Sequence, residues 1–446
     1  MPDLREFLAE MEKAGEIYRV KSEVSPRFEA AAVIRRLEGK YVVYLEKVKG
    51  YSMPVVAGIC ATRERLNKAL NVSSIEEFYL KLLEAIKKPS KCKRVEEDSV
   101  RRVQVEVNLE RLPVLTHYEA DGGPYITAGL VAAQSIDGEI ENVSIHRLQV
   151  LDRKRFAIRL VPRHLYKLYV DAKSRGKPLD VAIAIGVHPA LALAASASPP
   201  YGVSEYEVAN RLLGGKLQLV KCGAVEAYFP AGCEIVLEGK ILPNVEVSEG
   251  PFADLTGTYD AVRKQPVVEV LAVHLREKPV YQAILPAGLE HKLLMGVGRE
   301  AQIWEAVRGV VPKVGGVNLT PAGGGWLHAV ISIQKQVDGD AKNAIMAAFA
   351  AHPSLKHVVV VDLDIDVYDL EEVEWALATR FQGKKGLLVV EDVRGSTLDP
   401  SADQVTGLTT KIGLDATRPI DAPEEKFRKV RIPGEEETLR RVLGEG

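Results

Sequence analysis

Apolar residues recur at helical spacing near the start of the chain. Between positions 4 and 11 they return every three or four residues, which predicts an amphipathic helix. Asp3 and Glu6 have the spacing of a capping box at its start. A second helix is predicted to begin at Ser74 and to end before Pro89. Together with a predicted strand at 41–45, these helices indicate a small α/β domain.

After residues 1–102, the extent predicted for this first domain, the pattern changes to short β-type runs separated by turns. Asp137-Gly138, between two of these runs, is a hairpin signal. Many short strands without helical spacing favour a barrel or a sandwich, which we predict over residues 103–295. The strands are predicted at 125–134, 143–150, 156–161, 181–187, 234–237 and 266–274.

In the last third of the chain, helical and strand-like stretches alternate. Strands are predicted at 356–363 and 386–391, and a helix at 370–381. This alternation predicts a second α/β domain over residues 296–446, ending in a charged tail. The whole chain is therefore expected to have a mixed α/β fold of three domains, with the polar stretch 88–101 at the first boundary.

Composition narrows the range of partners. The 446-residue chain has a formal net charge of −2, which offers no general attraction to nucleic acid or anionic membranes. Its four cysteines have no CxxC spacing, which argues against a disulfide framework or a zinc ribbon. The first residues lack an apolar signal core, and no apolar run reaches membrane-spanning length. We therefore expect a cytoplasmic protein that acts on a small molecule, with no nucleic acid and no membrane as partner.

The most informative run covers residues 249–260. Glu249 and Asp254 flank a Gly250-Pro251 turn, which is a stiff bend because Gly permits unusual backbone angles and Pro fixes φ. Such a bend can hold two carboxylates near one point, and neighbouring carboxylates push their pKa values apart. The pair is thus a candidate general acid/base unit. Taken alone, the run is more often an ordinary polar turn with two solvated acids.

A second candidate group lies earlier in the chain. The run 142–147 lies on a predicted barrel strand, where alternation puts Asn142 and His146 on one face and Arg147 on the other. Asn142 and Glu205 supply hard oxygen donors of the kind that hold Mg²⁺ or Mn²⁺ beside a phosphate. His164 is a candidate nitrogen ligand. The alternatives are strand-edge polar residues, a helix first-turn acid and a structural histidine.

These runs, in this order, resemble the UbiD family of decarboxylases that use prenylated FMN. The similarity extends over nearly the whole chain. It implies an N-terminal α/β domain, a central FMN-binding split β-barrel and a C-terminal α/β domain with an oligomerisation tail, so that a homodimer or higher homo-oligomer is expected. The most specific matching runs are 112–127, 142–147, 204–206, 249–254 and 413–417.

The resemblance implies a catalytic role for three residues. Arg147, Glu249 and Asp254 match the family's Arg–carboxylate–carboxylate network. Many members carry Glu where this chain has Asp254, which shortens the acid by one methylene. A decarboxylation at an unactivated sp² carbon needs an electron-accepting cofactor, while the protein positions the substrate and supplies a proton. We expect Arg147 to clamp a carboxylate, and Asp254 to donate the proton with Glu249 as its partner.

The resemblance also implies the cofactor-binding residues. Asn142 and Glu205 match ligands of Mn²⁺ (or Mg²⁺) bound to the cofactor phosphate, and His164 falls where some members place a third ligand. Potassium often accompanies the divalent ion, and Ala194, Ala195 and Glu205 lie in the matching stretch. The positions that match prenylated-FMN contacts are Asn142, Ile145, His146, Arg147, Arg159, Leu160, Val161, His164, Leu165 and Glu205.

The substrate is a further expectation. His291 and Lys292 lie where family members line the substrate end, and they would suit a phosphorylated tail. The Glu-, Arg- and Val-rich composition resembles that of archaeal thermophiles, in which a UbiD-like enzyme converts trans-anhydromevalonate 5-phosphate to isopentenyl phosphate and CO2. An aromatic acid of the 4-hydroxybenzoate type is the second substrate class. A non-catalytic flavin-binding scaffold is the alternative of another kind, and a flavin prenyltransferase is the expected supplier of the cofactor.

Overall fold

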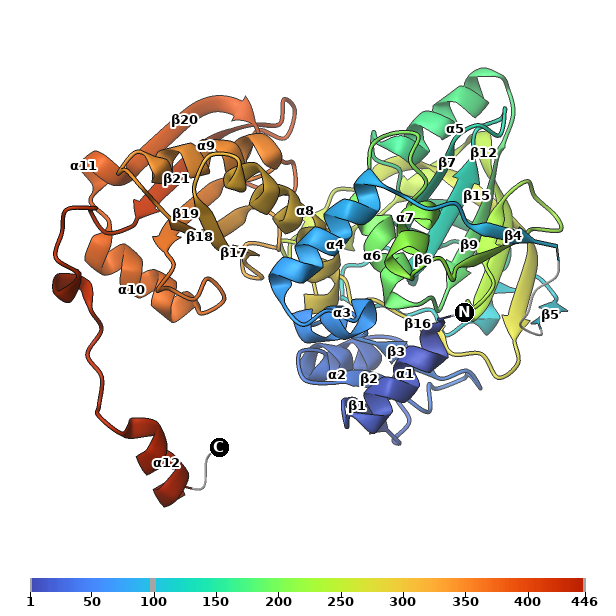
Figure 1. Ribbon diagram of the computed structural model, residues 1–446. Coiled ribbons are helices and arrows are strands. Elements are labelled where there is room, and N and C mark those ends of the chain that lie inside the picture. Colours follow the sequence, from blue (N-terminus) through green and yellow to red (C-terminus); the bar gives the residue numbers. More distant parts are fainter. Residues whose placement is uncertain (1, 97–101, 444–446) are drawn as a thin grey trace.

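The computed structural model describes residues 2–96 and 102–443. Its N-terminal part is a small sheet of strand order β1-β2-β3-β16 with helices packed around it (Figure 1). The predicted helix start at Asp3 is confirmed, because Glu6 N donates to Asp3 Oδ1 at 2.9 Å. The elements are α1 (Leu4–Lys13), β1 (Ile17–Val20), α2 (Glu29–Leu37), β2 (Val42–Leu45), β3 (Val55–Ala57), α3 (Arg63–Leu70) and α4 (Ile75–Lys87).

The central part is built on a closed antiparallel barrel, as predicted. Its sheet has the order β12-β9-β6-β7-β8-β15-β5, and a further pairing between β12 and β15 closes six of these strands on themselves. The barrel strands are β6 (Tyr125–Gln134), β7 (Glu141–Val150), β8 (Arg155–Ile158), β9 (Leu179–Ile185), β12 (Ile235–Glu249) and β15 (Arg263–Arg276), with β5 (Arg102–Val105) at the edge.

Side-chain alternation on these strands separates two apolar cores. Val131, Ile183 and Val268 belong to one buried cluster, whereas Leu130 and Ala184 belong to another that continues into the surrounding helices. The remaining central elements are β4 (Lys93–Val95), η1 (Leu109–Arg111), α5 (His164–Ser174), α6 (Pro189–Ala197), α7 (Glu205–Leu212), β10 (Gln218–Lys221), β11 (Tyr228–Pro230), β13 (Phe252–Ala253), β14 (Tyr259–Asp260) and β16 (Tyr281–Gln282).

The C-terminal part is a five-stranded mixed sheet of order β17-β18-β19-β21-β20. Along β19, Val358 and Val360 face the cluster that includes α8 and α9, and Val359 and Val361 face α10, so helices cover both faces. The elements are α8 (Leu289–Arg308), β17 (Lys313–Leu319), β18 (His328–Gln334), α9 (Asp340–Ala351), β19 (His357–Asp362), α10 (Leu370–Arg380), α11 (Gly383–Gly386), β20 (Leu387–Arg394), β21 (Leu408–Ala416), η2 (Glu424–Phe427) and α12 (Glu435–Leu443).

The two predicted domain boundaries can be compared with the structure to different extents. The first was placed in the polar stretch 88–101, whose last five residues lie outside the described part. The second, between residues 295 and 296, falls inside α8. This helix is continuous and lies between the barrel and the C-terminal sheet (Figure 1). Its N-cap is Gly288, which makes no side-chain cap, so the sequence carries little signal for its start.

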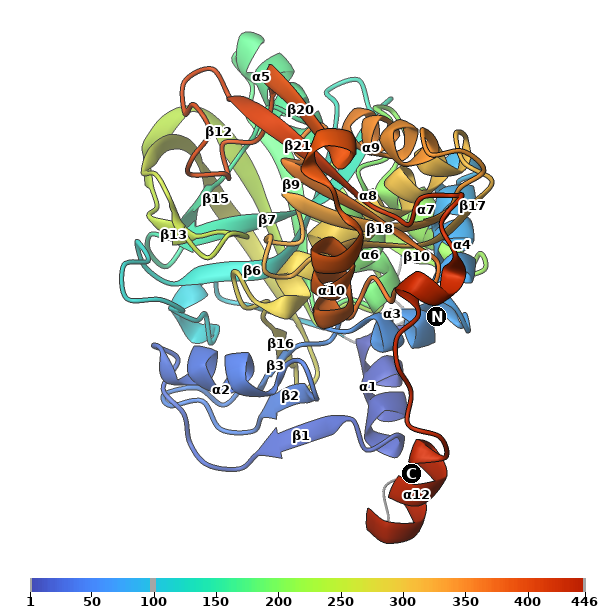
Figure 2. The ribbon, with the colours of Figure 1, turned by 90° about the vertical axis from the view of Figure 1, so that its left-hand side faces the viewer.

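The end of the chain leaves the body of the molecule. Figures 1 and 2, which are views at right angles, both show α12 standing apart from the three folded parts. The predicted charged tail is therefore an extended arm that carries a short exposed helix. None of the described helices combines the length and the apolar content needed to cross a membrane.

Candidate active site

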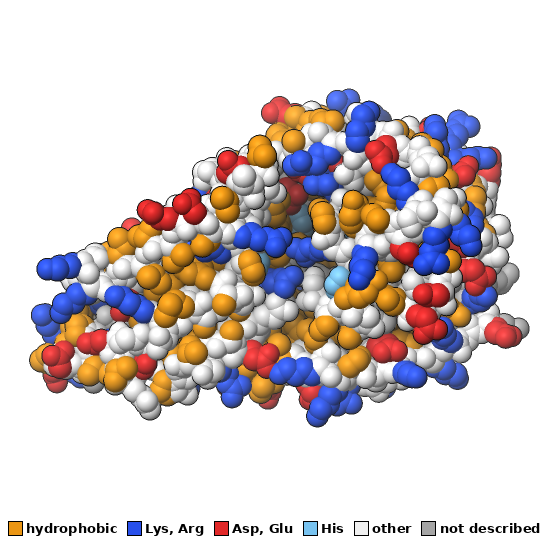
Figure 3. Space-filling view, turned by 90° about the horizontal axis from the view of Figure 1, so that it is seen from above, with side chains coloured by type: hydrophobic (Ala, Val, Ile, Leu, Met, Phe, Trp, Pro, Cys, Tyr) orange, Lys and Arg blue, Asp and Glu red, His pale blue; other side chains and the backbone are white. Residues whose placement is uncertain are grey.

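A cavity of about 700 Å³ lies where the barrel, α8 and the C-terminal domain meet. Strand β7, the segment before α5, the 252–260 hairpin and α8 form most of its wall. The C-terminal domain contributes Trp326, Ser354 and residues 396–398. Figure 3 shows Lys and Arg side chains gathered around a hollow on this face of the molecule. A volume of this size accommodates a cofactor together with a small substrate.

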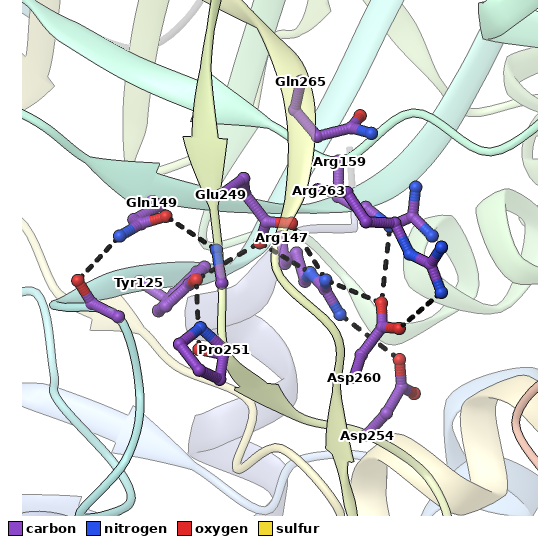
Figure 4. Close-up of polar contacts among 12 residues, drawn as sticks. Tyr125, Arg147, Gln149, Arg159, Glu249, Pro251, Asp254, Asp260, Arg263 and Gln265 are labelled. Carbon is purple, nitrogen blue, oxygen red and sulfur yellow. Dashed lines mark hydrogen bonds and ion pairs between the residues drawn. The ribbon is translucent and has the colours of Figure 1, made fainter. Parts of the chain in front are cut away.

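Arg147 of β7 lines this cavity and binds three carboxylates (Figure 4). Its Nε and Nη2 donate to Glu249 at 2.9 Å each, its Nη1 donates to Asp254 at 3.3 Å, and its Nη2 also donates to Asp260 at 2.9 Å. Asp260 in turn pairs with Arg159 at 3.5 Å. The structure thus brings together the predicted Arg147, Glu249 and Asp254, and adds a third acid.

The three acids differ in their access to the cavity. The Glu249 side chain is fully buried, whereas the Asp254 side chain is 21% exposed and lines the cavity. Burial opposes the charge of Arg147, but the hydrogen bonds and charge of Glu249, with Asp254 and Asp260, outweigh it and raise the pKa of the guanidinium. Arg147 is therefore permanently charged, and Asp254 is the acid best placed to meet a substrate.

Hydrogen bonds to its backbone hold the turn that carries these acids in place. Gln149 Oε1 accepts from Gly250 N at 3.1 Å, and Gln149 Nε2 donates to Gly122 O at 2.7 Å. Gly122 N donates to Pro251 O at 2.8 Å, so the 117–123 loop lies directly against the turn. A Cβ on Gly122 would stand 2.3 Å from Gly250 O. Glycine at position 122 is required by this close approach.

Tyr125, which belongs to the same run 112–127 as Gly122, also contacts the acid cluster around Arg147. Tyr125 Oη donates to Glu249 Oε1 at 3.2 Å. Its ring packs against Phe252 with centroids 4.6 Å apart, and Phe252 lies under the Arg147 guanidinium at 4.6 Å. Side chains from β6, β12 and β13 therefore fix the orientation of Arg147 on β7.

The predicted metal-binding residues adjoin one another on the cavity wall. Asn142 Nδ2 donates to Glu205 Oε1 at 2.9 Å, and Val143 N donates to Glu205 Oε2 at 2.6 Å. Burial raises the pKa of Glu205 to about 8. His164, at the start of α5, lines the same cavity and packs edge-on against Tyr201. Within the described residues, no group of three or more His, Cys, Asp or Glu side chains has the arrangement of a metal site.

His146 continues the polar face of β7 beyond Asn142, as the alternation predicts. Ser144 Oγ donates to Asn142 Oδ1 at 3.1 Å and lies 2.9 Å from His146 Nε2, while His146 Nδ1 lies 2.9 Å from Arg159 O. Burial lowers the pKa of His146 to about 4, so its ring is neutral at neutral pH. The chain Asn142–Ser144–His146 thus lines the cavity with neutral polar groups.

The other predicted residues divide between the cavity wall and its surroundings. Leu160 is buried in the barrel core, where its N–H donates to Gln265, and Glu249 lies behind Arg147. Of the potassium stretch, Ala195 reaches the wall and Ala194 is buried behind it. The predicted cofactor and catalytic residues that line the cavity are Asn142, Ile145, His146, Arg147, Arg159, Val161, His164, Leu165, Glu205 and Asp254.

The two predicted substrate residues, His291 and Lys292, are neighbours on α8, and only His291 lines the cavity. His291 lines the cavity, and its Nδ1 accepts from Ala287 N at 3.2 Å, which leaves Nε2 as the protonated nitrogen. Burial lowers the pKa of His291, although the nearby charge of Asp254 opposes this. Lys292 is absent from the described wall of the cavity and interacts electrostatically with Glu38 instead.

Several residues that line the cavity were not predicted from the sequence. Asp260 ends the same run as Glu249, so a third acid in that run was the available signal. Arg299, Trp326 and residues 396–398 come from the C-terminal part of the chain, and no motif marks them. Only the fold brings them to the cavity.

Comparison with known protein families covers most of the chain. Residues 88–289 match the model of the UbiD family described as the 3-octaprenyl-4-hydroxybenzoate carboxy-lyase Rift-related domain. Residues 8–86 and 292–416 match the N-terminal and C-terminal domains of the same carboxy-lyase.

Individual relatives agree with this match. The chain is 48% identical over 429 residues to the anhydromevalonate phosphate decarboxylase of Methanothermobacter thermautotrophicus, covering 96% of this chain and 99% of that protein. It is similar to the UbiD-class enzyme HmfF from Pelotomaculum thermopropionicum in complex with FMN, with a TM-score of 0.94, 45% identity and 98% coverage of both chains. An evolved dimeric form of HmfF in complex with prFMN gives a TM-score of 0.90, 43% identity and again 98% coverage of both chains.

Proposed function

Because the chain belongs to the UbiD family of carboxy-lyases, we propose that it decarboxylates an α,β-unsaturated carboxylic acid with prenylated FMN as cofactor. The observation that carries this proposal is the cluster of acids around Arg147 at the wall of the cavity. Arg147 holds Glu249, Asp254 and Asp260, and Asp254 faces the space where a substrate would lie. A non-catalytic flavin scaffold has no need of such a cluster. Two similar proteins bind FMN and prFMN, which supports the choice of cofactor.

The residues of the cavity fit the proposed cofactor and a divalent ion. Glu205 is a buried carboxylate beside the Asn142 amide, and its raised pKa reflects a negative charge that burial disfavours. A Mn²⁺ or Mg²⁺ ion would stabilise that charge, with Asn142, Glu205 and His164 as its ligands. His146 and the segment 159–165 are the proposed contacts of the flavin, and a potassium ion near Ala195 is part of the same proposal.

The chain's own residues account for positioning and proton transfer. When bound, the cofactor supplies the electron sink that decarboxylation at an sp² carbon requires. Arg147 orients the substrate carboxylate, and the bidentate Glu249 keeps the guanidinium in place. Asp254 then delivers a proton to the carbon that lost CO2. The apolar wall of Phe252, Leu255 and Leu294 excludes water from this step.

For the substrate we propose trans-anhydromevalonate 5-phosphate, with isopentenyl phosphate and CO2 as products. The relative from Methanothermobacter thermautotrophicus, whose name states that activity, supports this choice. His291 lies beside the acid cluster, whereas Lys292 faces Glu38, so the proposed phosphate contact moves from Lys292 to other cations of the cavity. An aromatic acid of the 4-hydroxybenzoate type is the second candidate.

One experiment tests the function. Protein co-expressed with a flavin prenyltransferase, the proposed supplier of the cofactor, is offered trans-anhydromevalonate 5-phosphate, its dephosphorylated form and 4-hydroxybenzoate. We expect CO2 release from the first to exceed the second by about two orders of magnitude in kcat/KM, because a missing charged partner costs several kcal/mol. Release of CO2 from none of the three would contradict the proposed function, and a preference for the aromatic acid would replace the substrate.

We also propose that the protein works in the cytoplasm as a homodimer or higher homo-oligomer. The extended arm supports the second point, because its apolar residues Val430 and Ile432 are 99% and 68% exposed and α12 stands apart from the folded parts in Figures 1 and 2. The evolved form of HmfF is a dimer. We keep the first proposed domain boundary, after residue 102. For the second we propose the start of α8, Leu289, because this helix is continuous across residues 295 and 296.

A further inference from the structure

One face of α8 forms a continuous stretch of the cavity wall. His291, Met295 and Arg299 all line the cavity and are spaced four residues apart, so they lie on the same side of the helix. The first of them interacts with Asp254 of the acid cluster. Eight residues of helix rise span about 12 Å, so Arg299 is well removed from the place where decarboxylation is proposed.

Arg299 has no acidic partner among residues 2–96 and 102–443. Its Nη1 donates to the neutral amide of Gln302 at 2.7 Å, and its guanidinium lies 5.7 Å from the Trp326 ring centre. In the part of the chain that the structure describes, no carboxylate forms an ion pair with it. Desolvation, followed by the positive charge of Arg163, lowers the pKa of Arg299 to about 10. A half-buried guanidinium with no carboxylate partner among the described residues would be stabilised by a bound anion, which offsets the cost of its desolvation.

Arg163 is a second cation that lines the same cavity. It precedes α5 at the rim of the cavity, where it remains open to solvent, and it too makes no ion pair with any described carboxylate. Two other arginines of the cavity do have an acidic partner, because Arg147 and Arg159 both form ion pairs with Asp260. Arg163 and Arg299 line one cavity, and the positive charge of Arg163 lowers the pKa of Arg299, so an anion bound by both side chains would offset this repulsion.

We propose that Arg163 and Arg299 together form a binding site for a phosphate dianion in the cavity. Two guanidinium groups match the charge of a phosphate monoester, and each can donate two parallel hydrogen bonds to its oxygens. The inference rests on the proposed function, since both the flavin cofactor and the proposed substrate carry such a phosphate. It assigns to this chain a phosphate contact independent of the Asn142–Glu205 pair and of Lys292.

The test compares phosphorylated ligands with their phosphate-free forms in Arg299→Gln and Arg163→Gln. Apoprotein is titrated with FMN and with riboflavin by flavin fluorescence, and flavin-loaded protein with isopentenyl phosphate and isopentenol by calorimetry. Loss of one charged hydrogen-bonding partner should weaken binding of either FMN or isopentenyl phosphate by about 10- to 100-fold. Binding of the matching phosphate-free compound, riboflavin or isopentenol, should not change. The matched control is Arg308→Gln, on the same helix but stacked on Trp304 at the surface.

Each result decides between the two sources of the phosphate or against the site. A selective loss for FMN assigns the site to the cofactor, and a selective loss for isopentenyl phosphate assigns it to the substrate. Unchanged binding of both phosphates, or an equal loss for the phosphate-free compounds, would overturn the inference. Wild-type turnover of the proposed substrate is measured in parallel, so failure of this site is distinguishable from failure of the proposed function. Since Arg163 lies at the rim, its variant carries the test if Arg299→Gln does not fold.

Discussion

Glu249 meets Arg147 in a fork of two hydrogen bonds, each 2.9 Å long, with the carboxylate fully buried. The other two acids each accept one bond from the same guanidinium. Glu249 is thus the structural partner of Arg147, while Asp254 keeps one side open to the cavity. This division of labour among the acids underlies the first two predictions.

Asp254→Asn should retain flavin binding and lose turnover. Asparagine keeps the size of the side chain but cannot deliver a proton, and a positioned proton donor contributes about 10²–10⁴ in rate. The measurement is single-turnover CO2 release by flavin-loaded protein, with the flavin content determined by absorbance. Near wild-type activity would place the proton transfer on another group.

Asp260→Asn should destabilise the protein in a pH-dependent manner. Burial alone would raise the pKa of Asp260, but Arg147 and Arg159 outweigh it and lower the pKa. The contribution of the ionised acid is therefore present above the unfolded pKa, about 3.9, and is lost as pH falls through the lower folded value. At neutral pH we expect a loss of about 1–3 kcal/mol in the free energy of unfolding.

This prediction is checked by urea unfolding of wild type and Asp260→Asn at a series of pH values. The difference between the two proteins should be largest near neutral pH and should shrink once the pH falls below about 4. A difference that is independent of pH would mean that the charge of Asp260 does not contribute.

Gly122→Ala should disturb the turn that carries the catalytic acids. The new methyl group would stand 2.3 Å from Gly250 O and 2.8 Å from Gln149 Nε2, so the turn must shift. We expect a loss of about 1–3 kcal/mol in stability together with a drop in activity. Thermal unfolding and CO2 release measure the two effects. Gly223→Ala is the control, because a Cβ there meets nothing within 4 Å.

Arg63→Met should weaken the attachment of α8 to the N-terminal domain. Arg63 binds Glu300 through two contacts of 2.6 Å, and the Glu300 side chain is 1% exposed. Removing the arginine leaves the buried Glu300 carboxylate with only the neutral donors Tyr79 Oη and Leu319 N among the described residues, at a cost of about 3–5 kcal/mol by denaturant unfolding. The surface pair of Arg153 and Glu110 is the control, and Arg153→Met should cost less than about 1 kcal/mol. Equal effects in the two variants would contradict the prediction.

The sequence predicted those features that local pattern determines. Strand β6 is found at the predicted residues because a mostly apolar run between two turn signals has the length of a buried strand. The Asp137-Gly138 hairpin is confirmed by the antiparallel pairing of β6 with β7. The two-residue strands β13 and β14 were not predicted, because their pairing depends on the turn between them rather than on apolar spacing.

The candidate site shows the same division. Glu249 and Asp254 could be selected because they flank one turn, and Arg147 because a family motif includes it. The role of Asp260 depends on how β7 approaches the hairpin, and the position of Lys292 depends on which face of α8 turns to the cavity. Contacts of this kind arise from tertiary structure, and neither hydrophobic periodicity nor residue spacing predicts them.

Helix α8 limits how far this protein can be treated as a set of modules. It contacts α4 of the N-terminal domain, α6 beside the barrel, and α9 and β17 of the C-terminal sheet. Its first turn is also tied to the N-terminal domain, because Glu290 accepts from the Gly58 and Cys60 N–H groups at 2.8 Å each. A chimera joined within α8 would therefore disrupt all three domains at once. Exchange of the C-terminal domain between relatives has its natural junction before Leu289, and even there the incoming helix must match surfaces on two foreign partners.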